Sequence, residues 1–167
     1  LVITSGTVTI QGEIRAPAQQ IFELSGGTVN ISAAKFTTAY FEWYGITSGA
    51  DNSTAIQRLI TARKNTPGSI SATNIQLLPD TVYSHASTIN ANDVLQMSII
   101  GCGGGDYSPT SEFRYTGAGT AGWTIASAHG FVAKGVKFSY TNAGFTGVLV
   151  QSDWATDRKS TRLNSSH

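Results

Sequence analysis

Short groups of apolar residues alternate with polar ones along most of the chain. Within residues 2–31 the apolar positions include Val2, Val8, Ile10 and Ile14, and this period of two predicts half-buried strands. The same pattern predicts eight further strand segments, at residues 75–78, 81–83, 95–100, 112–115, 123–125, 131–132, 136–138 and 147–150. Each segment is too short to bury its apolar side alone. We therefore expect successive segments to stack as the coils of a solenoid, with loops of unequal size between them.

One segment follows a helical period instead. Ile56, Leu59 and Ile60 are spaced i, i+3 and i+4, which predicts an amphipathic helix over about residues 54–64 with these three side chains on its buried face. Residues 51–53 (Asp-Asn-Ser) precede it, and each of these side chains can accept a hydrogen bond from a free N–H group at a helix start. This is the only helix that we predict.

Aromatic residues gather shortly before the predicted helix. Residues 40–45 are Tyr-Phe-Glu-Trp-Tyr-Gly, and we expect them to form a packed, strand-like anchor. Upstream, the pair Gly26-Gly27 is predicted to form the turn between two strands near residues 21–22 and 29–31. We treat residues 1–39 as a strand-rich lead-in.

Composition supports a strand-rich domain and excludes several classes of protein. The chain has 167 residues, of which only 13% are charged, and it contains 18 Ser, 21 Thr and 18 Gly. This mixture favours strands and turns over a helical bundle. The net charge of +1 argues against a nucleic-acid-binding protein, and the chain lacks an apolar run of the roughly 18 residues that a membrane span needs. A single cysteine, Cys102, excludes an internal disulfide and a multi-cysteine metal site.

The two ends of the chain carry separate expectations. The first residue is Leu1 rather than Met, so we expect the natural start, with any signal peptide, to be missing. Residues 157–167 (DRKSTRLNSSH) resemble the in-frame translation of a common short-read sequencing adapter. We therefore leave this artefactual tail out of the fold, and we expect the gene to have been cut near residue 156, with catalytic residues downstream.

Four motifs occur in an order that resembles a known family. They are Glu-Trp-Tyr-Gly at 42–45, Asp-Asn-Ser-Thr-Ala-Ile-Gln at 51–57, Leu-Pro-Asp-Thr-Val-Tyr at 78–83 and Ile-Ile-Gly-Cys-Gly at 99–103. This order is similar to the N-terminal module of the pectate-lyase-like superfamily of right-handed parallel β-helix proteins, in particular the rhamnogalacturonase and epimerase-like members. The resemblance extends over residues 1–156. One departure is Pro79-Asp80, where the family usually has Pro-Gly.

The resemblance implies an all-β fold, a fragment of a right-handed parallel β-helix. Residues 40–156 would form its first coils, and the helix at 54–64 would cover the open N-terminal end of the first coil and shield its unpaired strand edges. Proteins of this superfamily include polysaccharide lyases, glycoside hydrolases and phage tailspikes, so the fold alone leaves the activity open.

For function, the resemblance implies an N-terminal, non-catalytic fragment of a secreted protein that acts on or binds polysaccharide. The parent would be a lyase or a hydrolase, and we expect this fragment to be inactive. The alternative is a receptor-binding phage tailspike or surface fibre, which would be a homotrimer on the virion. We expect no cofactor, and no acidic cluster in this sequence would hold the Ca²⁺ that a full-length parent could use.

Carboxylates are the first candidates for sugar chemistry, because glycoside hydrolysis needs two of them close together. After the helix the acids are Asp80, Asp93, Asp106, Glu112 and Asp153, and none forms a close sequence pair. Turn or surface positions are the alternative for each. Asp106 and Glu112 are our catalytic candidates, because we place them in the long loop between coils, where clefts form.

Aromatic rings and isolated ligand-type residues complete the candidates. Trp43 and Tyr44 are our carbohydrate-binding candidates, since aromatic rings stack on sugars; the alternative is that they pack the helix against the first coil. His85 and His129 have no acid or cysteine at metal-ligand spacing, so we predict no metal site. For Cys102 we expect a buried, inert thiol, because no base lies near it in the sequence.

Overall fold

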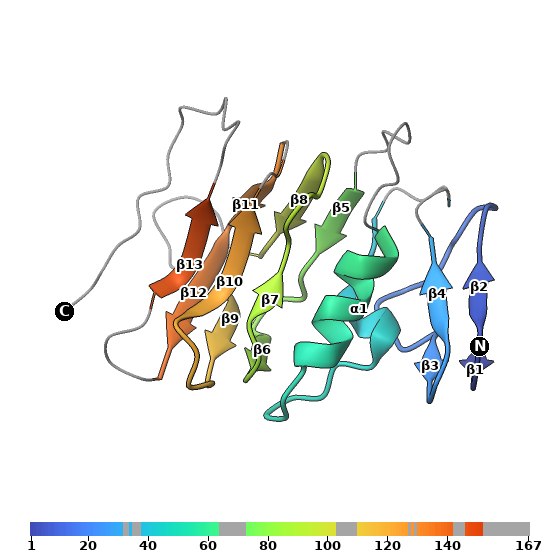
Figure 1. Ribbon diagram of the computed structural model, residues 1–167, viewed down its shortest axis with the longest axis horizontal. Helices are drawn as coiled ribbons and strands as arrows, with labels where there is room; N and C mark the ends of the chain where they lie inside the picture. The colour runs from blue at the N-terminus through green and yellow to red at the C-terminus, as the bar shows by residue number, and fades with distance from the viewer. Residues whose placement is uncertain are drawn as a thin grey trace.

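Strands dominate the structure, and one α-helix lies among them (Figure 1). The computed structural model describes residues 1–31, 34, 38–63, 73–102, 110–126, 128, 130–141 and 146–151. The first half contains β1 (Val2–Ile3), β2 (Thr7–Thr9), β3 (Glu23–Leu24), β4 (Thr28–Asn30), the 3-10 helix η1 (Phe41–Tyr44) and α1 (Ser53–Arg63). The second half contains β5 (Thr73–Gln76), β6 (Val82–His85), β7 (Ile89–Asn90), β8 (Met97–Ile100), β9 (Ser111–Tyr115), β10 (Ala121–Ala126), β11 (Val132–Lys134), β12 (Val136–Tyr140) and β13 (Thr146–Gln151).

The strands from β5 onward form three parallel sheets, and each sheet takes every third strand. Their orders are β5-β8-β11, β6-β9-β12 and β7-β10-β13. All strand pairs among the described residues are parallel, which excludes hairpins between these strands, and no sheet closes into a barrel. The prediction of an all-β fold with parallel pairing is therefore confirmed.

The lead-in strands form two small parallel sheets of their own. β1 pairs with β3 and β2 with β4, so Val2 lies beside Glu23 and Thr7 beside Thr28. The hydroxyls of Thr7 and Thr28 are 2.7 Å apart. The strands on either side of Gly26-Gly27 therefore pair with earlier strands, not with each other. A Cβ atom on Gly27 would lie 2.2 Å from the Ile3 side chain, so glycine is required by this close approach.

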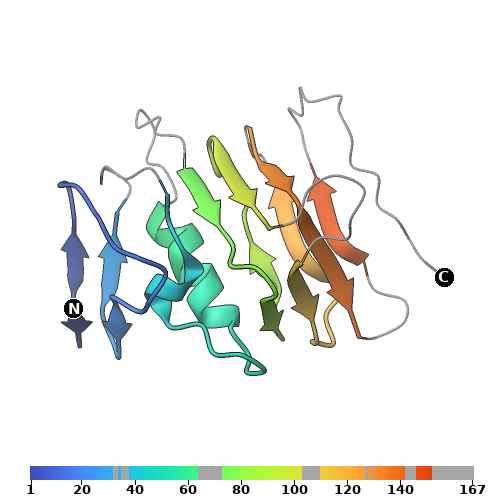
Figure 2. The ribbon, with the colours of Figure 1, turned by 180° about the vertical axis from the view of Figure 1, so that it is seen from behind.

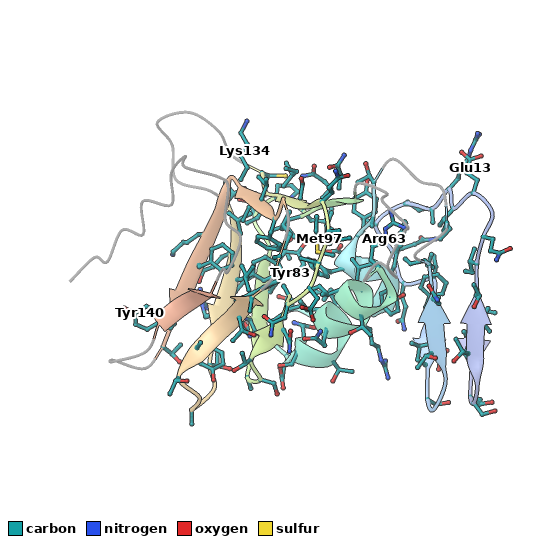
Figure 3. All side chains as sticks on the ribbon, turned by 45° about the horizontal axis from the view of Figure 1, so that its top comes forward. Glu13, Arg63, Tyr83, Met97, Lys134 and Tyr140 are labelled. Atoms are coloured by element: carbon teal, nitrogen blue, oxygen red, sulfur yellow. The ribbon has the colours of Figure 1, made fainter. Side chains whose placement is uncertain are left out.

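Aromatic side chains pack between sheets β6-β9-β12 and β7-β10-β13. Tyr83, Phe113 and Phe138 occupy one row across β6, β9 and β12, with ring centroids 5.4 Å and 5.6 Å apart. Trp123 on β10 lies 4.9 Å from the Phe113 ring, and Phe41 of η1 lies 5.8 Å from it. Each such pair contributes about 0.5–1.5 kcal/mol beyond its burial. Figure 3 shows Tyr83 among the packed elements, whereas Lys134 and Tyr140 project outward.

The aromatic segment at residues 40–45 is not strand-like, and this expectation is wrong. Phe41–Tyr44 form a 3-10 helix, which ends at Gly45 in the left-handed region (φ 84°). The carbonyl of Trp43 accepts hydrogen bonds from the N–H groups of both Ile21 and Phe22. These bonds hold the segment as a turn against the lead-in, so it does not enter a strand ladder.

The α-helix lies where the sequence predicted it, but it is not the outermost layer. Ile56, Leu59 and Ile60 are buried as expected. On its other side the helix meets the lead-in, because the Ile31 N–H donates to the Ala62 carbonyl. Figures 1 and 2 show α1 between β4 on one side and β5 and β7 on the other. The lead-in strands thus form a further layer beyond the helix.

Candidate functional site

Three strands, β5, β6 and β7, are the first members of the three sheets, and each has one edge without a neighbouring strand among the described residues. A bare strand edge presents unpaired N–H and C=O groups and invites pairing with other chains. The segment from Ala39 to Gln57 lies along these edges and supplies hydrogen bonds to all three. We call this segment the cap.

At β5 the cap uses its backbone. Ala39 forms a parallel bridge with Ile75. Its N–H donates to the Asn74 carbonyl at 2.8 Å, and its carbonyl accepts from the Gln76 N–H at 2.9 Å. A single residue therefore satisfies both polar groups that β5 directs outward here.

At β6 the cap uses the turn that precedes α1. The Asn52 N–H donates to the Ser84 carbonyl at 2.9 Å. The Ala86 N–H donates to the carboxylate of Asp51 and to the Ser53 hydroxyl, at 2.9 and 3.0 Å. Hydrogen bonds from the Ser53 hydroxyl and from N–H groups lower the pKa of Asp51, so its carboxylate stays charged at this edge.

The Asn52 side chain fixes the shape of this turn. Its Oδ1 accepts from the Thr47 N–H at 2.8 Å, and its Nδ2 donates to the carbonyls of Thr47 and Ala50, both at 3.0 Å. Asn52 is buried, so these three bonds are shielded from water. The prediction that residues 51–53 start the helix is confirmed for Asp51, whose carboxylate accepts from the Ser53 N–H.

At β7 the cap uses one side chain in place of a strand. Gln57 Oε1 accepts from the Asn90 N–H at 2.7 Å, and Gln57 Nε2 donates to the Asn90 carbonyl at 3.0 Å. The amide thus makes the two hydrogen bonds that a neighbouring peptide group would make. The cap therefore supplies hydrogen bonds to the first strand of each of the three sheets.

A buried carboxyl group of the cap contacts β6. Glu42 of η1 accepts a 2.7 Å hydrogen bond from the Tyr83 hydroxyl through Oε1, and Oε2 has no hydrogen-bond partner among the described residues. Burial raises the pKa of Glu42, and the bond from Tyr83 offsets only part of this. The Tyr83 hydroxyl also accepts from the Leu78 N–H at 2.9 Å, so the pair joins η1 to the end of β5. The sequence pattern did not predict that Glu42 and Tyr83 form a pair.

Glu112, the catalytic candidate on β9, is held by basic groups. Arg114 Nε lies 2.8 Å from its Oε1 and Lys137 Nζ 3.1 Å from its Oε2, and the Ser139 hydroxyl donates to Oε1. Burial raises the pKa of Glu112, but the bonds from Ser139, Arg114 and Lys137 outweigh it and lower the pKa overall. A carboxylate held charged in this way is unsuited to donate a proton as a general acid.

The other acidic candidates are not brought to Glu112 by any described contact. Asp106 and Asp153 lie outside the described residues. Asp80 and Asp93 both have positive φ angles, of 52° and 56°, which agrees with the turn positions given as their alternative.

The aromatic candidates Trp43 and Tyr44 are buried, with 0% and 4% of their surfaces exposed. The indole N–H of Trp43 donates to the Pro17 carbonyl at 2.9 Å, and the Tyr44 ring packs 5.1 Å from that of Phe22. Neither ring offers a free face on which a sugar could stack. Both rings pack inside the protein, and these two contacts are with Pro17 and Phe22 of the lead-in.

The remaining ligand-type residues do not assemble a metal site. His85 is buried beside Tyr115, and burial lowers its pKa. The half-buried Cys102 thiol donates to the Leu77 carbonyl at 3.2 Å, and His129 lies outside the described residues. Within the described residues no three His, Cys, Asp or Glu side chains are grouped so that they could hold a metal ion.

Two further findings concern membrane-spanning helices and similarity to known proteins. In the part of the chain that the structure describes, no helix combines the length and apolar character that crossing a membrane requires. A search of family models, curated proteins and solved structures finds no match to this chain.

Proposed function

We propose that this chain is the capped first part of a right-handed parallel β-helix, from a pectate-lyase-like protein that acts on or binds polysaccharide. Its own role is structural and non-catalytic: the cap ends the solenoid on one side and provides the first coil on which others stack. The observation that supports this proposal best is the cap itself, which gives hydrogen bonds to the edges of β5, β6 and β7 through Ala39, Asn52 and Gln57.

The strand order supports a solenoid. When every third strand pairs in parallel, as in β5-β8-β11, the chain completes one circuit between neighbours in a sheet. The right hand follows from a general rule, since about 98% of parallel strand connections within one sheet are right-handed.

The outward face of sheet β6-β9-β12 supports contact with a polar polymer. Its side chains form two rows across the three strands, one with Glu112 beside Lys137 and the other with Ser84, Arg114 and Ser139 in register. Arg114 and Lys137 keep 42% and 53% of their side chains exposed, so their N–H donors are available to hydroxyl or carboxylate groups of a glycan.

Disulfide trapping tests the stacking. In a Cys102→Ser background, Ser84→Cys with Arg114→Cys places two thiols on adjacent strands in register, where the Cα distance permits a disulfide. We expect this pair to oxidise readily. The control pair, Ser84→Cys with Lys137→Cys, joins positions that are neither on adjacent strands nor in one row, and should stay reduced. The opposite result would contradict the stacked arrangement.

Carbohydrate assays test the function. We expect the purified chain to depolymerise neither pectin nor rhamnogalacturonan, and measurable cleavage would overturn the non-catalytic role. In affinity electrophoresis, retardation by a polysaccharide that is lost in Arg114→Ala/Lys137→Ala but kept in Arg15→Ala would support binding at this face. A stable trimer in sedimentation experiments would instead favour the tailspike alternative.

A further inference from the structure

A groove of about 360 Å³ lies between α1 and the lead-in strands, away from Glu112 and its basic partners. Leu24, Thr28 and Val29 form one side, and the helix forms the other with residues such as Thr54 and Arg58. The groove lies within the size range of sites for small molecules, about 300–1,000 Å³. The hydrogen bonds from the cap to β5, β6 and β7 do not account for this groove.

One buried polar atom in the lining has no partner. Tyr44 lines the groove with only 4% of its surface exposed, and its hydroxyl makes no hydrogen bond to any residue that the structure describes. A buried donor left unsatisfied is costly to the folded state. Phenylalanine would fill the same space beside Phe22 without this cost. The hydroxyl is therefore explained better by a ligand atom that it contacts than by packing.

Arg58 supplies the charge of the groove. Among the described residues of the lining it is the one charged side chain, and none of them is a carboxylate. Its Nη2 donates to the Leu24 carbonyl at 3.1 Å, which fixes the guanidinium at the groove. A guanidinium has five N–H donors in a planar fork, so the others remain to bind a carboxylate.

Hydroxyl groups surround this cation. Thr54, Thr61, Ser87 and Thr88 all line the groove, together with Thr28. Thr88 donates to the Ala121 carbonyl and Thr61 accepts from Gln57, so each keeps further capacity for a ligand hydroxyl. A simple carboxylate such as acetate would use Arg58 but leave these groups unused.

We propose that the groove binds a small carboxylate that also carries hydroxyl groups, such as a single sugar-acid unit, with its carboxylate at Arg58 and Tyr44. The proposal does not rest on the polysaccharide-binding role of sheet β6-β9-β12, and either can fail without the other.

The test uses isothermal titration of the intact chain with three probes. Glucuronate carries both features of the proposed ligand, glucose has the ring hydroxyls without the carboxylate, and acetate has the carboxylate without the hydroxyls. We expect glucuronate to bind at least tenfold more tightly than either of the others. Equal affinity for all three, or no binding of glucuronate at millimolar concentration, would overturn the proposal.

Two substitutions locate the site. Tyr44→Phe removes only the unpartnered hydroxyl, and we expect it to weaken glucuronate binding about three- to tenfold while the protein melts at the same or a higher temperature. Arg58→Gln should weaken binding at least tenfold, and Arg58→Lys, which keeps the charge, should fall between. The matched control is Arg15→Gln, an exposed arginine that pairs with Glu13 and does not line the groove, which should bind as the unaltered chain does. Loss of binding in the control with full binding in Arg58→Gln would refute this location.

Discussion

Replacing Glu42 by Gln tests whether the contact between η1 and β6 contains a costly buried charge. The carboxyl group accepts one hydrogen bond, from Tyr83, and its second oxygen has none. Glutamine keeps the Oε1 acceptor for Tyr83 and has nearly the same size, but it cannot ionise. The substitution therefore changes the charge and leaves the packing of Phe41 and Trp43 around it unaltered.

The sign of the effect follows from the direction of the pKa change. Burial raises the pKa of Glu42 in the folded protein above its ordinary value of 4.5. The folded state therefore binds the proton more tightly than the unfolded state, and this stabilising contribution is present at low pH and is lost as the pH rises from 4.5 through the folded-state pKa. Glu42→Gln lacks this loss, so its advantage over the natural residue grows with pH.

The magnitude can be bounded. A buried polar group without a partner costs about 1–3 kcal/mol, and a charged one costs more. We therefore expect the difference in unfolding free energy between Glu42→Gln and the natural protein to increase by about 1–3 kcal/mol between pH 4 and pH 8. Against a total stability of about 5–15 kcal/mol for a domain, this is measurable by urea unfolding at each pH.

A second variant separates charge from packing. Tyr83→Phe removes the hydrogen bond that lowers the pKa of Glu42, so the pKa should rise further and the pH dependence should steepen. In the double variant Glu42→Gln/Tyr83→Phe this steepening should vanish. A difference curve for Glu42→Gln that is flat, or that falls as the pH rises, would refute the reasoning.

Three further predictions concern the cap, the coils and the outer face. Gln57→Ala should lower stability by about 1–2 kcal/mol and speed hydrogen exchange at the Asn90 amide, and unchanged exchange would contradict the edge role. Gly101→Ala should cost about 1–3 kcal/mol in thermal unfolding, because its Cβ would lie 1.9 Å from the Gly135 carbonyl oxygen, whereas Gly12→Ala, in open space, should be neutral. Glu112→Gln should lower the free energy of unfolding by at most about 1 kcal/mol near pH 7, because the cationic partners of Glu112 are half exposed. This loss should disappear as acid protonates Glu112. A larger loss in urea unfolding would contradict this prediction.

The local elements were largely predictable from the sequence. Period-two alternation located most strands to within one or two residues, and the spacing of Ile56, Leu59 and Ile60 located the helix and its buried face. β7, at Ile89–Asn90, was missed. It contains only one buried apolar residue, so no alternation was present to detect.

The pairing of these elements was less predictable. Ile99 and Val136 both lie in apolar segments and are 37 positions apart. They do not pair with each other, because Ile99 pairs with Ala133 and Val136 pairs with Ser111. The strands of one sheet are separated by loops of unequal length, so spacing alone cannot assign an apolar segment to its row. The ion pair of Glu112 with Lys137 depends on this register and was missed for the same reason.

The cap was the hardest feature to foresee, because its partners are chosen by tertiary position. Gln57 was noted only as the last residue of a motif, and an exposed glutamine on a helix ordinarily binds water. Its function arises because α1 runs beside the unpaired edge of β7, where an amide has the donor and acceptor that a peptide group would present.

The two ends of the three parallel sheets therefore differ. On the cap side, backbone groups at Ala39 and Asn52 and the side chain of Gln57 occupy the strand edges, so another strand cannot add there. On the other side β11 and β12 each have a single strand neighbour among the described residues, and Val132 and Tyr140 on them are 39% and 43% exposed. An edge with apolar side chains and free peptide groups favours the addition of a further strand, whereas a capped edge opposes it.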